Sequence, residues 1–345
     1  MIGSIKIDGV DYGSKDDFDT LIVEFTGIRA QIFEFLKEWF SASDEIAVFT
    51  SGSTGKPKKL DLNKTVMRKS ARATCEYFSL DSGSIIHLCL PVSFIAGKMM
   101  LVRGLVSGAN IIVEEPVVSP MLAYSGPISF SAMTPAQVHK VLSDDRERLD
   151  DVKNLIIGGA PVGMDLEDQL QHIQTNCYST FGMTETATHV ALMRLNGTNK
   201  SDVYRAVGDV TFGIDERMCL VINSESLGLA NLITNDIVEI VDSSSFRWLG
   251  RQDHVINTGG IKVFPEQLEK KMGHTLNGNF FFAAMPDDHF GEIVILLVEG
   301  KERRIDLTVL SKFEQPKRVY FVERFSLTGS GKIDRKKVLK ELLDA

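Results

Sequence analysis

The strongest indication of how this chain folds is the stretch Thr50-Ser51-Gly52-Ser53-Thr54-Gly55-Lys56-Pro57-Lys58. It follows the apolar run Ile46-Ala47-Val48-Phe49, which predicts a short buried strand. Glycine allows a backbone to turn its N–H groups toward one point, and hydroxyl and ammonium groups add further donors there. The stretch therefore predicts a loop that binds a polyphosphate, whose negative charge needs many converging donors.

Two other interpretations compete with this one. A Walker-type phosphate loop needs a glycine at position 50 and a serine or threonine at position 57. The chain has Thr50 and Pro57 at these positions, so that interpretation is excluded. A polar surface turn without a ligand stays open, because loops of Ser, Gly and Pro are common.

The composition is that of a globular protein with room for two domains. The chain has 345 residues, of which 43% are hydrophobic and 24% charged. The formal net charge of −8 argues against a nucleic-acid-binding surface. The cysteines are scattered and form no CxxC pair, which argues against a disulfide framework or a zinc site. They are Cys75, Cys89, Cys177 and Cys219.

The sequence gives no sign of secretion or of a membrane span. Its first residues lack the basic-then-apolar pattern of a signal peptide. Residues 116–139 carry no Asp, Glu, Lys or Arg, but prolines interrupt them repeatedly, so they predict buried strands and loops. We expect a cytoplasmic protein.

Strand patterns alternate with helical ones along most of the chain. Helices are predicted over residues 21–40, 97–106, 165–173, 265–272 and 307–313. Asn63 can cap a helix that ends near Phe78, and Thr134-Pro135-Ala136-Gln137 is a strong helix start. A further helix is predicted from Asp334. Such alternation is typical of a wound α/β sheet.

Residues 203–248 change to short alternating strands, and a domain boundary is expected near residues 249–253. We therefore expect an α/β fold with two domains. The first, residues 1–249, would contain wound sheets with helices and a β-rich subdomain. The second, residues 250–345, would be a small, mobile α+β domain.

A second polar stretch, Tyr178-Ser179-Thr180-Phe181-Gly182-Met183-Thr184-Glu185-Thr186, follows a predicted strand. Beside a triphosphate loop, Glu185 can hold Mg²⁺ and Thr184 can donate to a phosphate. Taken alone, the stretch could equally be a strand-end loop without function.

The two stretches, in this order, resemble the phosphate loop and the aromatic-Gly-Met-Thr-Glu motif of the adenylate-forming superfamily. That superfamily contains acyl-CoA synthetases, luciferases and peptide-synthetase adenylation domains. The resemblance implies that Gly159 and Ala160, in Gly158-Gly159-Ala160-Pro161, line an adenine pocket. Phe181 stands where the family usually has an adenine-contacting tyrosine.

The resemblance continues toward the end of the chain. Asp236 and Arg251 would contact the ribose, although Asn235 stands where the family usually has glycine. Asp253 corresponds to the hinge between the two domains. Taken singly, Asp236 and Asp253 could also be loop acids without a ligand, and Arg251 could be a surface arginine.

Two further motifs follow the hinge. The stretch Thr258-Gly259-Gly260-Ile261-Lys262-Val263-Phe264-Pro265 resembles the loop that faces the acyl site during thioester formation, although Gln267 replaces the usual acid. The stretch Thr328-Gly329-Ser330-Gly331-Lys332-Ile333-Asp334-Arg335 resembles the motif of the adenylation lysine, here Lys332. The glycines of this stretch would make it flexible enough to carry Lys332 to a distant site. The alternative is a lysine that is simply exposed to solvent.

The resemblance covers the chain from about residue 44 onward. The family usually has a longer segment before the phosphate loop, so we expect a compact member with a reduced N-terminal subdomain. Lys56, Glu185, Arg251 and Lys332 are all present, which argues against an inactive descendant.

The resemblance implies ATP, Mg²⁺ and CoA as cofactors and co-substrates. The carboxylic acid substrate would attack the α-phosphate of ATP, giving acyl-AMP and pyrophosphate. The predicted phosphate loop, Mg²⁺ and Lys332 would offset the negative charge on the phosphates. Rotation about Asp253 would then bring Gly259, Gly260 and Lys262 to the site, where a thiol displaces AMP.

Two segments suggest which carboxylic acid is the substrate. They are Leu90-Pro91-Val92-Ser93-Phe94-Ile95-Ala96-Gly97-Lys98 and Thr188-His189-Val190-Ala191-Leu192. In the first, Phe94 replaces the histidine that the family usually has before Gly97. These segments look most like those of short o-succinylbenzoate–CoA ligases of menaquinone synthesis. The second carboxylate of that acid could bind Lys98 or Arg194, but Lys98 could equally be a snorkelling helix residue.

Other functions stay open. They are another small-acid CoA ligase, a stand-alone adenylating domain that loads a carrier protein, and a nucleotide-binding regulatory protein.

Overall fold

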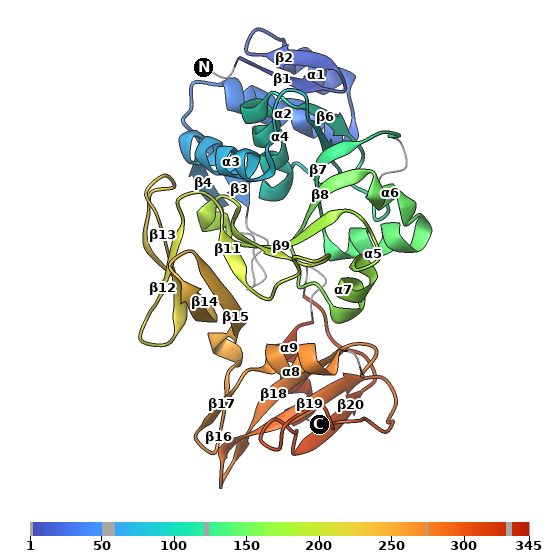
Figure 1. The fold of residues 1–345 in the computed structure, drawn as a ribbon, viewed down its shortest axis with the longest axis vertical. Coiled ribbons are helices and arrows are strands. Elements are labelled where there is room, and N and C mark those ends of the chain that lie inside the picture. The colour runs from blue at the N-terminus through green and yellow to red at the C-terminus, as the bar shows by residue number, and fades with distance from the viewer. Residues whose placement is uncertain (1–2, 50–58, 121–123, 274, 329–332, 345) are drawn as a thin grey trace.

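The computed structural model describes residues 3–49, 59–120, 124–273, 275–328 and 333–344 (Figure 1). The predicted phosphate loop, residues 50–58, and the predicted adenylation lysine, Lys332, lie outside the described residues. Within the described ranges, no helix is both long and apolar enough to cross a bilayer.

The described residues form an α/β fold, as the sequence predicts. The helices are α1 Phe18–Glu24, α2 Gly27–Phe40, α3 Lys64–Phe78, α4 Ile95–Ser107, α5 Pro135–Asp144, α6 Glu147–Asp150, α7 Met164–Leu170, α8 Pro265–Met272 and α9 Arg335–Leu343, with 3₁₀ turns η1 Thr184–Thr186 and η2 Gln252–His254. The strands of the large sheet and of the β3–β4 pair are β1 Ser4–Ile7, β2 Val10–Gly13, β3 Glu45–Phe49, β4 Lys59–Asn63, β5 Ile85–Leu88, β6 Asn110–Val113, β7 Ile128–Met133, β8 Val152–Ile157, β9 Asn176–Gly182, β10 His189–Arg194, β11 Tyr204–Ala206, β12 Thr211–Ile214, β13 Cys219–Ser224, β14 Leu229–Asp242 and β15 Ser245–Arg251. The remaining strands are β16 Ile256–Thr258, β17 Ile261–Val263, β18 Phe280–Asp287, β19 Gly291–Glu299 and β20 Arg318–Val322.

The large sheet is wound on one half and antiparallel on the other. Its order is β12-β13-β14-β15-β11-β10-β9-β8-β7-β5-β6-β1-β2. Neighbours from β1 through β6, β5, β7 and β8 to β9 are parallel, and those from β9 to β12 are antiparallel. The carboxyl ends of the parallel strands therefore meet at one edge.

Helices cover both faces of the wound half. Ile156 on β8 joins the core formed with α2, α3 and α4, whereas Leu155 and Ile157 join the core formed with α5 and α7. Successive residues of a strand point to opposite faces, so the apolar run Leu155-Ile156-Ile157 at the end of β8 is buried on both sides.

The antiparallel half confirms the β-rich part predicted for residues 203–248. Its strands β11 to β15 enclose a separate aromatic and aliphatic core that includes Phe212 and Phe246.

The C-terminal part has a sheet and cores of its own. Strands β16 to β20 form a five-stranded sheet, and α8 and α9 pack against it (Figure 1). The predicted domain boundary at 249/250 and the mobility of the second domain remain predictions.

Helix caps follow the sequence closely. The Asn63 side chain accepts from the Thr65 N–H at the start of α3. At the start of α5, Thr134 and Gln137 form the predicted capping box. Both signals depend only on neighbouring residues, which explains why they are readable from sequence.

Two helix predictions are wrong. Residues 21–40 do not form one helix, because Phe25 and Thr26 are extended and Gly27 has φ +62°. The Glu115 carboxylate then accepts from the Ile28 N–H at the start of the second helix. Residues 307–313 form turns. Just before that segment Asp306 accepts from the Thr308 N–H, and such a local bond offers the backbone an alternative to a helix.

Candidate functional site

The loops that follow the parallel strands gather at one edge of the large sheet. Met133, Ile157 and Ser179 are register partners on β7, β8 and β9, so the segments just beyond them lie side by side (Figure 1). Open α/β sheets bind ligands outside the carboxyl ends of their strands. The predicted glycine turn after β8 and the predicted Glu185 loop after β9 both belong to this edge.

The glycine turn presents backbone rather than side chains. A Cβ on Gly158 would lie 2.3 Å from the Thr180 hydroxyl oxygen, so no larger residue fits without movement. Gly159 has φ +84° and is exposed, as is Ala160. A ligand can approach this backbone closely, which suits the adenine-lining role predicted for Gly159 and Ala160.

Glu185 lies on a short turn that Thr186 stabilises. The buried Thr186 hydroxyl accepts from the Met183 N–H at 3.0 Å and lies 2.6 Å from the Thr188 carbonyl oxygen, to which it can donate. Thr184 and Glu185 are thus held on η1, with the Glu185 side chain exposed. Glu185 forms no hydrogen bond or ion pair with any other described residue.

A magnesium ion fits this carboxylate. The described part of the chain contains no cluster of three or more His, Cys, Asp or Glu that could hold a metal. Mg²⁺ typically binds one or two carboxylates and completes its shell with water and substrate phosphates. The predicted metal role of Glu185 therefore requires a nucleotide at the same edge.

Phe181 lies in an aromatic cluster. Its ring meets those of Phe246 and Tyr204 with centroids 5.1 and 5.8 Å apart. The Tyr204 hydroxyl lies 2.9 Å from that of Ser179. Trp248 packs against the same core, which connects β9 with the end of β15.

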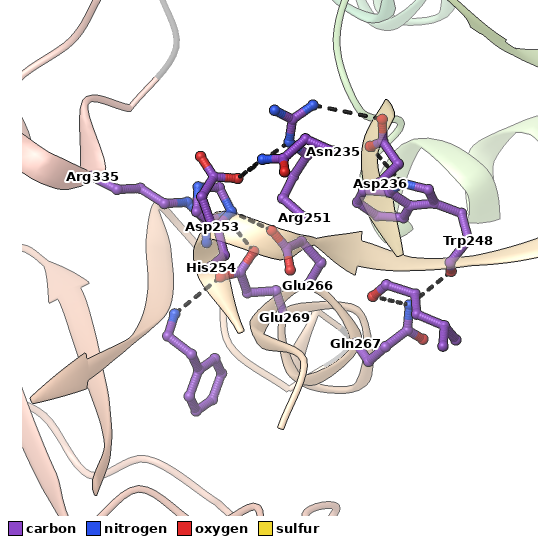
Figure 2. Close-up of polar contacts among 12 residues, drawn as sticks. Asn235, Asp236, Trp248, Arg251, Asp253, His254, Glu266, Gln267, Glu269 and Arg335 are labelled. Atoms are coloured by element: carbon purple, nitrogen blue, oxygen red, sulfur yellow. Dashed lines mark hydrogen bonds and ion pairs between the residues drawn. The ribbon is translucent and has the colours of Figure 1, made fainter. Parts of the chain in front are cut away.

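Figure 2 shows that Asp236 and Arg251 lie together, as the resemblance implies. They are register partners on β14 and β15, and Arg251 Nη1 is 3.6 Å from Asp236 Oδ2. Trp248 Nε1 donates to Asp236 Oδ1 at 3.0 Å. Asp236 is only 6% exposed, and this burial raises the pKa of its carboxyl group.

Asp253 accepts two hydrogen bonds at the expected hinge. Asn235 Nδ2 donates at 2.9 Å and Arg251 Nε at 3.4 Å, both to Oδ1. Burial acts to raise the pKa of Asp253, but electrostatic interactions with His254 and Arg251, together with hydrogen bonds, outweigh it and lower that pKa.

Lys98 and Arg194 have partners within the protein. Lys98 Nζ lies 5.1 Å from the ring centre of Phe35, and burial lowers the pKa of its ammonium group. Arg194 donates to the Tyr178 hydroxyl, to the Asn176 side chain and to the backbone of Asn196, all on neighbouring strands or loops. These contacts favour a structural role for both cations.

The other residues predicted for the acid pocket differ in exposure. Phe94 precedes α4 and is 51% exposed, and a Cβ on Gly97 would lie 2.3 Å from the Pro91 carbonyl oxygen. His189 is buried, with Nε2 3.2 Å from the Thr74 hydroxyl. Burial, reinforced by Arg103, lowers the pKa of His189 well below its usual value.

Arg103 is a candidate that the sequence analysis missed. It is 1% exposed, donates to the Thr188 hydroxyl at 3.2 Å and lies over the Phe130 ring. Its Nε has no hydrogen-bond partner, and no carboxylate among the described residues forms an ion pair with it. Burial lowers the pKa of Arg103 to about 10. The available signal was a single arginine within the apolar run 99–106.

The predicted thiol-step residues do not join this site. Gly259 and Gly260 form the turn between β16 and β17, and Lys262 on β17 is exposed. The tip of this hairpin lies at the end of the C-terminal part farthest from the large sheet (Figure 1).

Comparisons with known proteins agree with the family suggested by the motifs. The family described as AMP-binding enzyme matches residues 34–222. A 2-succinylbenzoate–CoA ligase from Listeria monocytogenes is 23% identical over 89% of this chain and 72% of its own length. One from Escherichia coli is 23% identical over 85% of this chain and 67% of its own length.

Solved structures have the same fold. An acyl-CoA synthetase (AMP-forming)/AMP-acid ligase II-like protein from Dyadobacter fermentans is 32% identical, with 94% of this chain and 98% of that chain covered and a TM-score of 0.64. An o-succinylbenzoate coenzyme A synthetase from Bacillus subtilis, in complex with ATP and magnesium, is 16% identical, with 85% and 69% covered and a TM-score of 0.70.

Proposed function

This chain belongs to the AMP-binding enzyme family, and on that premise we propose that it is a cytoplasmic, AMP-forming ligase that joins o-succinylbenzoate to CoA. The names of the similar ligases support the acid and the thiol. The ATP and magnesium of the Bacillus subtilis complex support the nucleotide and the metal.

The reaction would proceed in two steps. One carboxylate of the acid attacks the α-phosphorus of ATP, forming acyl-AMP and releasing pyrophosphate. The CoA thiol then attacks the acyl carbonyl, forming the thioester and releasing AMP. A carboxylate alone is a poor electrophile, so the first step supplies the leaving group for the second.

The described residues would bind and orient the substrates. Glu185 would hold Mg²⁺, which offsets phosphate charge when bound. Asp236 and Arg251, which lie together, would hold the ribose hydroxyls, and the backbone at Gly159 would line the adenine. The loop 50–58 and Lys332 would add positive charge near the phosphates.

The observation that carries the choice of acid is Arg103. A buried guanidinium without a carboxylate is costly, because desolvation is not offset by a nearby negative charge. A substrate with a second carboxylate would supply that charge. Arg103 donates a hydrogen bond to the Thr188 hydroxyl. Thr188 follows Glu185 by three residues, so this bond links the guanidinium to the segment that carries the predicted metal ligand. A dianionic acid therefore fits better than benzoate.

The proposal is tested by pyrophosphate release from ATP and Mg²⁺ with o-succinylbenzoate, benzoate, fatty acids and amino acids. We expect release with o-succinylbenzoate and a thioester after addition of CoA. ATP binding without pyrophosphate release would instead identify a regulatory nucleotide-binding protein. Transfer to a carrier protein but not to CoA would identify an adenylating domain.

A further inference from the structure

Two side-chain amides connect the large sheet to the C-terminal part of the chain. Asn235 on β14 donates through Nδ2 to Asp253 Oδ1 at 2.9 Å. Gln267 on α8 donates through Nε2 to the carbonyl oxygens of Trp248 (3.1 Å) and Leu249 (2.9 Å) at β15. Figure 2 shows both contacts within one cluster. We call Asn235 and Gln267 the bridging amides.

Neither contact could be made by the residue that the superfamily usually has at these positions. Glycine at 235 would offer no donor. A carboxylate at 267 has no hydrogen to donate, and it would face two carbonyl oxygens, which repel it. The two departures from the motif pattern therefore have one common result, a donor directed across the predicted domain boundary.

The bridging amides act where the two parts touch. Helix α8 packs against β15, and Gln267 lies in its first turn. In this orientation α8 and α9 lie toward the large sheet, whereas the β16–β17 hairpin points away from it (Figure 1). The orientation thus keeps Gly259, Gly260 and Lys262 away from the carboxyl edge that would bind the acid.

We propose that Asn235 and Gln267 are positioning residues that hold the C-terminal part in this orientation and so favour acyl-AMP formation over transfer to the thiol. This inference rests on the proposed function. A hydrogen bond between neutral groups, such as those of Gln267, shifts a two-state equilibrium by about threefold to tenfold, and one to a carboxylate, such as that of Asn235 to Asp253, shifts it by at least as much. Loss of one amide should therefore change the balance of the two half-reactions by a similar factor.

The variants Gln267→Glu and Asn235→Ala remove the donors. Gln171→Glu is the matched control, because Gln171 Nε2 also donates to two backbone carbonyls, those of Glu167 (2.7 Å) and Leu195 (2.9 Å), but within the large sheet and its helices. Acyl-AMP formation without CoA and transfer from isolated acyl-AMP to CoA are measured separately in single turnovers. We expect the ratio of transfer to formation to rise at least about threefold in both variants and to stay unchanged in the control.

A second measurement needs no substrate. Trypsin can cut after Arg251, whose side chain is 41% exposed and which lies at the predicted domain boundary. We expect the bridging variants to be cut faster there than the wild type, with the control cut at the wild-type rate. Wild-type ratios and wild-type cleavage in both variants would overturn the inference. If the wild type activates no acid, the proposed function fails, and the cleavage rates alone decide whether the amides hold the two parts together.

Discussion

At the scale of residues, two buried charges distinguish this site. Arg103 lies among apolar side chains with a hydroxyl as its polar partner, and Asp236 lies beneath an indole N–H. Burying either charge costs desolvation free energy, so neither is expected to make the folded protein clearly more stable. We infer that both are kept for ligand binding, and each can be tested by a substitution that removes the charged group.

The variant Arg103→Met should lose preference for a dianionic acid. We expect kcat/KM for o-succinylbenzoate to fall about 10- to 100-fold, mainly through KM, since a charge-assisted hydrogen bond is lost. Activity with benzoate should change little, and the Tm should not fall, because a buried charge is removed. Steady-state kinetics with both acids and a thermal melt provide the measurements. Equal losses for the two acids would contradict this role.

The variant Asp236→Asn should bind ATP more weakly and yet be more stable. Because burial raises the pKa of this carboxyl group, the folded protein holds its proton more tightly than the unfolded chain. This contribution to stability is full below the unfolded value near 3.8 and is lost as pH rises through the folded pKa. The variant's Tm advantage should therefore be larger at pH 7 than at pH 4.

Calorimetric titration with ATP tests the other half of this prediction. We expect affinity to fall roughly tenfold, as for loss of a charge-assisted hydrogen bond. An unchanged affinity would show that Asp236 does not bind the nucleotide.

At the scale of elements, α8 and α9 are joined by an ion pair. Arg335 at the start of α9 lies 2.6 Å from the Glu269 carboxylate of α8 and over the ring of Phe281. The other Glu269 oxygen accepts from the Phe282 N–H at 3.0 Å. The pair thus fixes the start of α9, and the predicted adenylation lysine, Lys332, stands three residues earlier in the sequence.

The variant Arg335→Met should destabilise the C-terminal part by roughly 3 kcal/mol, because it leaves the Glu269 carboxylate buried without a partner. The double variant Arg335→Met/Glu269→Gln should recover most of that loss, since the amide oxygen can still accept from Phe282. Urea denaturation of wild type, single and double variants provides the measurement. A double variant less stable than Arg335→Met would contradict the explanation.

At the scale of the whole molecule, the proposed reaction needs groups from both parts of the chain. Glu185, Asp236 and the glycine turn belong to the large sheet, whereas Lys332 belongs to the C-terminal part. Contact between the parts is made by α8 and β15, beside Asp253, the predicted hinge residue.

The variant Lys332→Ala should slow acyl-AMP formation about 10²- to 10³-fold, because one positioned charge is removed from the phosphates. Transfer from isolated acyl-AMP to CoA should be unaffected. Lys336→Ala is the control, since Lys336 is an exposed lysine of the same segment. If both variants lose the same activity, or if Lys332→Ala forms acyl-AMP at the wild-type rate, the assigned mechanism is wrong.

Local signals were readable from the sequence. The caps at Asn63 and Thr134, the wound sheet and the β-rich part depend on spacing and on bonds between neighbouring residues. The family was readable because its motifs are short and occur in order. By contrast, the prediction of a helix over residues 307–313 failed, since the Asp306 side chain bonds the nearby Thr308 N–H and favours a turn there.

The sequence by itself determined the family and the fold class. Only the tertiary structure decided that Arg103 is buried without a carboxylate, that Lys98 and Arg194 have partners within the protein, and that Gln267 donates across to β15. These properties depend on residues far apart in the chain. Burial and pairing arise when separate elements pack, and a sequence pattern records only which residues are neighbours along the chain.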